Sequence, residues 1–159
     1  MDLDQQIQTL IKNAPQDGKT PQVVAAITPA LKLLAEQLKH MQYYILQTLE
    51  QNWVLTTLGH RTETELEKRV IYAFPTLKDA SSSIVEDHVM AIPVPVIHIL
   101  FQMIAIEPLD SLIFFETPSN LTTATEVKRG DVQKLINIYL KQYQPPSNSN
   151  SSKIPPDIA

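Results

Sequence analysis

The order of segment types along the chain constrains its fold more than any single motif does. Residues 3–41 carry apolar side chains at the three- and four-residue spacing of amphipathic helices, with a break at residues 13–18. Thr20 and Pro21 form a typical helix start, and Pro29 predicts a bend because a proline inside a helix removes one backbone hydrogen bond. We therefore expect a short helix followed by a longer, bent one.

From residue 43 the chain becomes rich in aromatic and β-branched residues, which favour strands. Residues 43–49 and 53–58 predict a hairpin that turns at residues 50–52, and residues 69–77 predict a third strand. A longer helix stays open as the alternative to the hairpin, because four apolar residues continue the helical spacing: Leu38, Met41, Ile45 and Leu49.

The second half of the chain begins with residues 78–87, which predict a polar connection. Residues 88–94 are expected to be extended, because Pro93 and Pro95 disfavour helical angles in the residues before them. Residues 97–106 fit either a helix or a strand, and we favour a helix from the length of the segment and its flanks.

The last strand and helix are the clearest elements of the second half. Residues 110–117 form a nearly continuous apolar run and predict a central strand. Residues 118–125 predict a loop, and a final helix is expected to begin near Gly130. Residues 145–159 are rich in proline, serine and asparagine and predict a disordered tail.

This order differs from the regular strand–helix alternation of a doubly wound parallel sheet. It predicts an α+β fold, with an antiparallel or mixed sheet and helices packed mainly on one face. Residues 1–144 are expected to form a single domain, because a chain of 159 residues has room for one ordinary domain.

The composition excludes several kinds of chemistry. The chain has no cysteine, which excludes disulfides, thiolate metal sites and cysteine nucleophiles. Its three glycines lie too far apart to build a phosphate-binding loop. The net charge of −4 argues against a nucleic-acid-binding surface. We expect no cofactor and no nucleic-acid partner.

No segment has the composition of a membrane anchor. The longest apolar stretch, residues 89–106, is broken by Pro93, Pro95, His98 and Gln102, whereas a membrane helix needs about 20 mainly apolar residues. The beginning of the chain is polar and acidic, unlike a signal peptide. We therefore expect a cytoplasmic protein without a membrane partner.

Polar groups at predicted strand ends, together with one histidine in an apolar segment, are the candidate ligand-binding residues. They are His60, Arg61, Arg69, His88 and His98. None of the four histidines stands at the spacing of a local metal-binding pair, so we expect no metal site. No Gly-x-Ser-x-Gly motif occurs, and no catalytic residue is predicted. His98 is expected to hydrogen-bond Gln102, one helical turn further on.

Two pairs of neighbouring aromatic residues lie on predicted strands. They are Tyr43 with Tyr44, and Phe114 with Phe115. Neighbouring side chains on a strand point to opposite faces, so helices on one face would cover only half of these rings. The other half predicts an interface, most simply with a second subunit.

Three segments also carry a family resemblance: QNWVLTTLGHR (residues 51–61), EKRVIYAFPTLKDA (67–80) and HILFQMIAIEPLDSLIFFETP (98–118). In these segments the chain resembles a small uncharacterised protein family of cyanobacteria. The similarity covers residues 21–143. It implies a bacterial cytosolic setting, and no activity, cofactor or catalytic residue follows from it.

The sequence thus favours a non-catalytic interaction or regulatory domain that self-associates as a homodimer and has an unknown protein partner. The alternative is a small-molecule-binding domain, or a weakly marked enzyme, that uses the region of His60 and His98.

Overall fold

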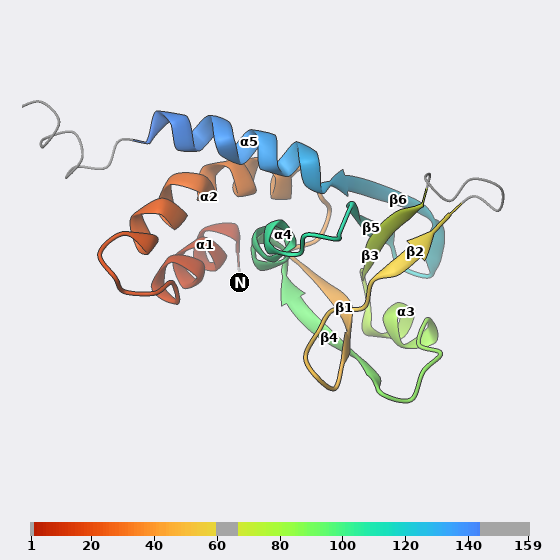
Figure 1. Cartoon of the computed structure of the whole chain (residues 1–159). Helices are drawn as coiled ribbons and strands as arrows, with labels where there is room; N and C mark the ends of the chain where they lie inside the picture. The colour runs from red at the N-terminus through yellow and green to blue at the C-terminus, as the bar shows by residue number, and fades with distance from the viewer. Residues whose placement is uncertain (1, 60–66, 144–159) are drawn as a thin grey trace, which may run out of the picture.

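The computed structural model describes residues 2–59 and 67–143. These residues form five helices and a six-stranded mixed sheet, which confirms the predicted α+β class (Figure 1). The helices are α1 (Leu3–Lys12), α2 (Thr20–Glu36), α3 (Leu77–Ser82), α4 (Val96–Ala105) and α5 (Arg129–Gln142). The strands are β1 (Gln42–Thr48), β2 (Thr56–Leu58), β3 (Lys68–Phe74), β4 (Val89–Pro95), β5 (Ser111–Thr117) and β6 (Asn120–Lys128). The predicted tail, residues 145–159, lies outside the described residues.

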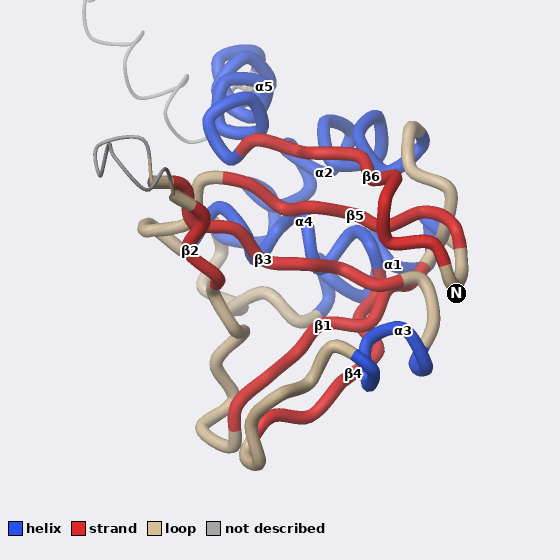
Figure 2. Tube along the Cα trace, turned by 90° about the vertical axis from the view of Figure 1, so that its right-hand side faces the viewer, coloured by secondary structure: helices blue, strands red, loops and turns tan. Residues whose placement is uncertain are grey.

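The strands are hydrogen-bonded in the order β4-β1-β3-β5-β6, and β2 pairs with the first half of β3 (Figure 2). The pairing of β3 with β5 is parallel, and the other pairings are antiparallel. A parallel pair needs a crossover connection, and α3, β4 and α4 together connect β3 to β5. The position of β5 between β3 and β6 confirms the predicted central strand.

Four helices, α1, α2, α4 and α5, pack on one face of the sheet, as predicted (Figures 1 and 2). Helix α4 resolves the ambiguity of residues 97–106 in favour of a helix, and its Leu100 is fully buried. Leu31 of α2, Ile71 of β3 and Leu112 of β5 are also at most 1% exposed, so the core lies between these helices and the sheet. None of the helices in the described ranges is long and apolar enough to cross a membrane.

A buried glutamine joins three elements near the start of α4. The side chain of Gln6 in α1 is 4% exposed. Its amide nitrogen donates to the backbone oxygen of Met41 at 2.9 Å, and its amide oxygen accepts from the backbone N–H of Ile97 at 2.9 Å. Gln6 thereby satisfies one of the backbone donors that the first turn of α4 leaves without a partner in the helix.

Two predicted loops are wrong. Residues 78–87 were expected to be a polar connection, but α3 (Leu77–Ser82) occupies their first half, with the Thr76 hydroxyl accepting from the backbone N–H of Asp79 as its cap. Residues 118–125 were expected to be a loop, but β6 begins at Asn120 and pairs with β5. A helix of six residues is too short to show periodicity, and the polar composition of β6 hides a strand at the sheet edge.

The predicted hairpin is correct at its turn and wrong in its second strand. Strand β1 excludes the alternative of a longer helix, and Gln47 and Trp53 form an antiparallel bridge across the turn. The next strand, β2, pairs with β3 instead of β1. On the side of β1 where Trp53 forms its bridge, the neighbouring strand is β3, and β4 pairs along the other side.

Candidate functional site

The sheet face opposite the four helices carries a row of aromatic rings. Tyr72 and Phe74 occupy alternate positions of β3, so they share this face, and Phe115 of β5 joins them. The Phe115 ring stacks on Tyr72 with ring centroids 5.5 Å apart and on Phe74 with centroids 5.4 Å apart. Tyr72 and Phe115 are only half-buried. We call this surface the open face.

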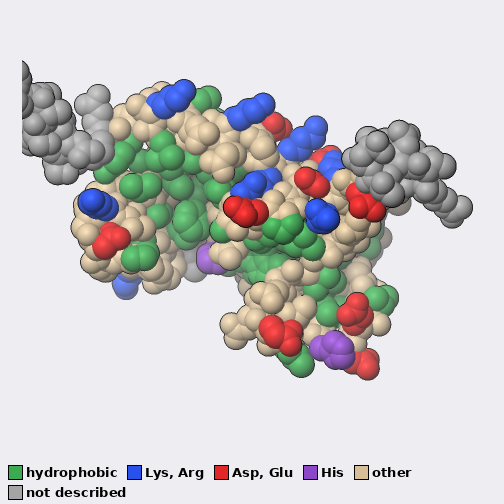
Figure 3. Space-filling model, viewed as in Figure 1, with side chains coloured by type: hydrophobic (Ala, Val, Ile, Leu, Met, Phe, Trp, Pro, Cys, Tyr) green, Lys and Arg blue, Asp and Glu red, His purple; other side chains and the backbone are tan. Residues whose placement is uncertain are grey.

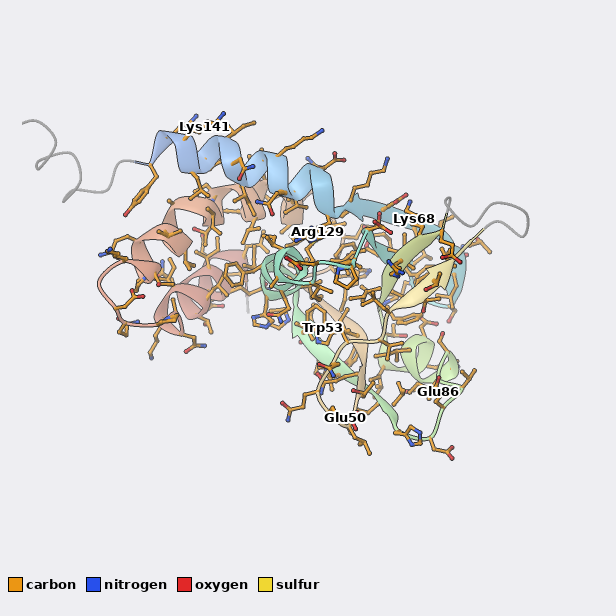
Figure 4. The ribbon with its side chains drawn as sticks, viewed as in Figure 1. Glu50, Trp53, Lys68, Glu86, Arg129 and Lys141 are labelled. Carbon is orange, nitrogen blue, oxygen red and sulfur yellow. The ribbon has the colours of Figure 1, made fainter. Side chains whose placement is uncertain are left out.

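A groove of about 450 Å³ follows the open face. The segment after α3 forms one wall, and the rim carries two exposed hydrophobic residues, Val85 (92% exposed) and Leu121 (41% exposed). Among the described residues that line it, Glu86 is the one charged residue (Figure 4). The groove is therefore apolar in its centre and suits a partner that brings apolar side chains.

The structure divides the four predicted interface residues between the two faces. Tyr43 and Phe114 are fully buried beneath the helices, where their rings meet edge to face with centroids 4.9 Å apart. Tyr44 pairs in register with Phe74 and is half-buried on the side of the open face, as is Phe115. The accessible members of the predicted interface are thus Tyr44 and Phe115.

A second cavity, of about 370 Å³, lies between α1 and β4. We call it the α1–β4 cavity; its walls include Leu10, Gln47, Trp53, Ile92 and His98. The space-filling view shows the surface hollowed where α1 meets the paired strands β1 and β4 (Figure 3). Its volume falls in the usual range of small-molecule sites, roughly 300–1,000 Å³.

The candidate ligand-binding residues do not meet at one point. His60 and Arg61 lie outside the described residues. His88 and the Arg69 side chain are exposed, and neither lines the groove or the α1–β4 cavity. The Arg69 backbone N–H donates to the carboxylate of Asp110 at 2.8 Å, which ties β3 to the start of β5. Of this set, His98 is placed in a cavity wall.

His98 stands on the first turn of α4 and is exposed at the edge of the α1–β4 cavity. Within the described residues it makes no hydrogen bond to Gln102, so that prediction is wrong: both side chains face outward, one turn apart. The surrounding protein desolvates the imidazole and lowers its pKa below the ordinary 6.5. The ring is therefore neutral at pH 7 and offers one donor and one acceptor.

This pKa shift predicts a pH dependence of stability. Because the folded state disfavours protonated His98, the unfolded state binds more protons once the pH falls below 6.5. We expect His98→Gln to reduce the loss of stability between pH 6.5 and the lower pKa of the folded state. Urea midpoints of both proteins across this range measure the difference. An unchanged pH profile in the variant contradicts the assignment.

A buried carboxylate is the most prominent polar feature that the sequence analysis missed. Glu116 of β5 is 7% exposed and faces the helices. Its carboxylate accepts from the Tyr43 hydroxyl, from the Lys39 backbone N–H at 3.2 Å and from the Thr125 hydroxyl at 3.4 Å. Burial, and then the hydrogen bond to Glu116, raise the pKa of Tyr43.

The Glu116 network links β5 to the segment between α2 and β1. The backbone oxygen of Glu116 lies 2.7 Å from Nε2 of His40, and the His40 backbone N–H donates to the Tyr43 hydroxyl at 3.2 Å. Neither the groove nor the α1–β4 cavity includes Glu116, so no substrate space adjoins it there. The period-two pattern of β5 is the signal that identifies it, because it places Glu116 on the same face as Leu112 and Phe114.

No metal centre emerges from the described ranges, in which no three histidine or acidic side chains gather at metal-binding distance. Comparison of the chain with models of known protein families finds no match, and comparison with curated proteins finds none. The open face and the α1–β4 cavity are the candidate functional surfaces.

Proposed function

We propose that this chain is a non-catalytic interaction domain that forms a homodimer through the open face. The observation that carries the proposal is the stacked row of Tyr72, Phe74 and Phe115 on the face opposite the four helices, in which Tyr72 and Phe115 are only half-buried. Partly exposed aromatic rings beside exposed apolar residues are typical of protein–protein contact surfaces.

The charge distribution supports a second copy as the partner. Each copy carries a net charge of −4, so two copies repel unless their contact surface is nearly uncharged. The groove meets this condition, since Glu86 is the one charged residue in its described lining. Lys68 and Glu126, on the same sheet face, neutralise one another in an ion pair.

The sheet edges favour contact through the face over contact through the edge. Strand β4 is one outer strand, and its Pro93 and Pro95 lack the N–H that pairing with another strand needs. At the other edge, the register of β5 with β6 shifts between Phe115 and Thr117, an irregularity that disturbs pairing with a further strand. A symmetric dimer joined through its sheet faces remains the simplest arrangement.

Charged substitution of the groove rim tests the proposal. The double variant Val85→Asp and Leu121→Asp places carboxylates at two exposed positions, where the fold tolerates them, and should convert the dimer to a monomer. The matched control is Leu33→Asp with Ile138→Asp, two exposed hydrophobic residues on α2 and α5. Light scattering after size-exclusion chromatography measures the mass of both.

We expect the rim variant to be monomeric and the control variant to stay dimeric. If both variants keep the dimer mass, the open face is not the contact surface. If the control also dissociates, the added charge alone causes the loss, and the role of the open face is likewise rejected.

A further inference from the structure

The α1–β4 cavity is independent of the open face, because it lies on the helix side of the sheet. Trp53 reaches it from the turn after β1 and is half-buried there, below α4 in Figure 4. The bridge to Gln47 fixes the backbone of Trp53, and its ring packs against the edge of the core. A held, partly exposed indole is a surface on which a flat ring can stack.

Polar side chains line the α1–β4 cavity beside Trp53. Gln47 in β1, Asn13 at the end of α1 and His98 in α4 all line the cavity. Within the described residues, none of these three side chains has a hydrogen-bond partner in the protein. Each of the two amides offers donors and an acceptor, and the neutral imidazole of His98 offers one of each. A ligand that both donates and accepts hydrogen bonds therefore matches this set.

Charge narrows the class of ligand. The described residues that line the cavity include no aspartate, glutamate, lysine or arginine. A charged ligand would lose hydration there without gaining an opposite charge, which is unfavourable. An uncharged ligand does not lose the hydration free energy of a charge.

We propose that the α1–β4 cavity binds an uncharged, planar heteroaromatic compound that carries a hydrogen-bonding amide or ring edge. The ring stacks on Trp53, and its polar edge faces His98 and Gln47. The inference goes beyond the interaction function, because neither the dimer nor the open face requires this cavity.

The single tryptophan of the chain makes the test specific, since the indole N–H of Trp53 gives one resonance in a ¹H–¹⁵N spectrum. The compounds to titrate are nicotinamide, adenine and uracil, which are uncharged and planar. Nicotinate, which has the ring of nicotinamide but a carboxylate in place of the amide, is the charged control. Titration to about 10 mM covers a fragment with a dissociation constant near 1 mM.

We expect at least one uncharged compound to shift the Trp53 resonance to saturation. If nicotinamide binds, nicotinate should bind at least tenfold more weakly. His98→Ala should weaken binding of the uncharged compound that saturates the Trp53 resonance about tenfold, which corresponds to the loss of about 1.4 kcal/mol of binding free energy. His88→Ala is the matched control, because His88 is exposed and lies outside the cavity, and it should bind normally.

Three results would overturn the proposal. They are the absence of saturation with all three uncharged compounds, binding of nicotinate as tight as that of a nicotinamide that binds, and unchanged affinity in His98→Ala. The Val85 and Leu121 rim variant should bind as the unmodified chain does, so failure of the cavity proposal and failure of the dimer proposal can be told apart.

Discussion

Replacing Glu116 with alanine is expected to lower the free energy of unfolding by about 3 kcal/mol. The change removes the acceptor shared by the Tyr43 hydroxyl, the Lys39 backbone N–H and the Thr125 hydroxyl. A buried donor that loses its partner costs roughly 1–3 kcal/mol, and Tyr43 is fully buried. Urea unfolding followed by circular dichroism measures the loss.

Two further variants show that the effect comes from the network. Glu116→Gln keeps one acceptor oxygen and should cost less than Glu116→Ala. Glu107→Ala removes an exposed carboxylate near the end of α4 and should change stability by less than about 0.5 kcal/mol. Equal stability of Glu116→Ala and Glu107→Ala would show that the buried network contributes nothing.

The adjacent residues Phe114 and Phe115 should respond very differently to truncation. Phe114 is fully buried beneath the helices against Tyr43, so Phe114→Ala should cost about 3–5 kcal/mol. Phe115 is half-buried on the open face, so Phe115→Ala should cost about 1–2 kcal/mol in the monomer. Thermal or urea unfolding at low protein concentration separates the two.

Concentration dependence adds a second distinction between these residues. Phe115→Ala should weaken the dimer, so its stability should depend less on protein concentration than that of the unmodified chain. If Phe115→Ala destabilises the monomer as much as Phe114→Ala does, the two rings are equally buried, and the assignment of faces is wrong.

The elements that the sequence predicted well are those with a strong local pattern. The apolar run of β5 and the proline in the first turn of α2 identify their elements without any tertiary information. Strand β6 has no such pattern, because most of its side chains are exposed at the sheet edge. Its pairing with β5 is a tertiary feature, which the local pattern of residues 120–128 does not indicate.

For the candidate sites, too, local sequence patterns predicted only part of the arrangement. Alternation along the strands correctly indicated that each aromatic pair divides between two faces, but which ring faces the helices depends on where the helices pack. The α1–β4 cavity brings together Asn13, Gln47 and His98 from three separate elements, and no short-range signal connects them. Gln6 likewise reaches Ile97 across 91 positions of the sequence.

Sedimentation equilibrium of the unmodified chain measures whether it forms the dimer on which the proposed function depends. At concentrations near 100 µM, about a hundredfold above a dissociation constant of about 1 µM, we expect the mass of two chains, falling toward one chain on dilution. The mass of a single chain at 100 µM would contradict it.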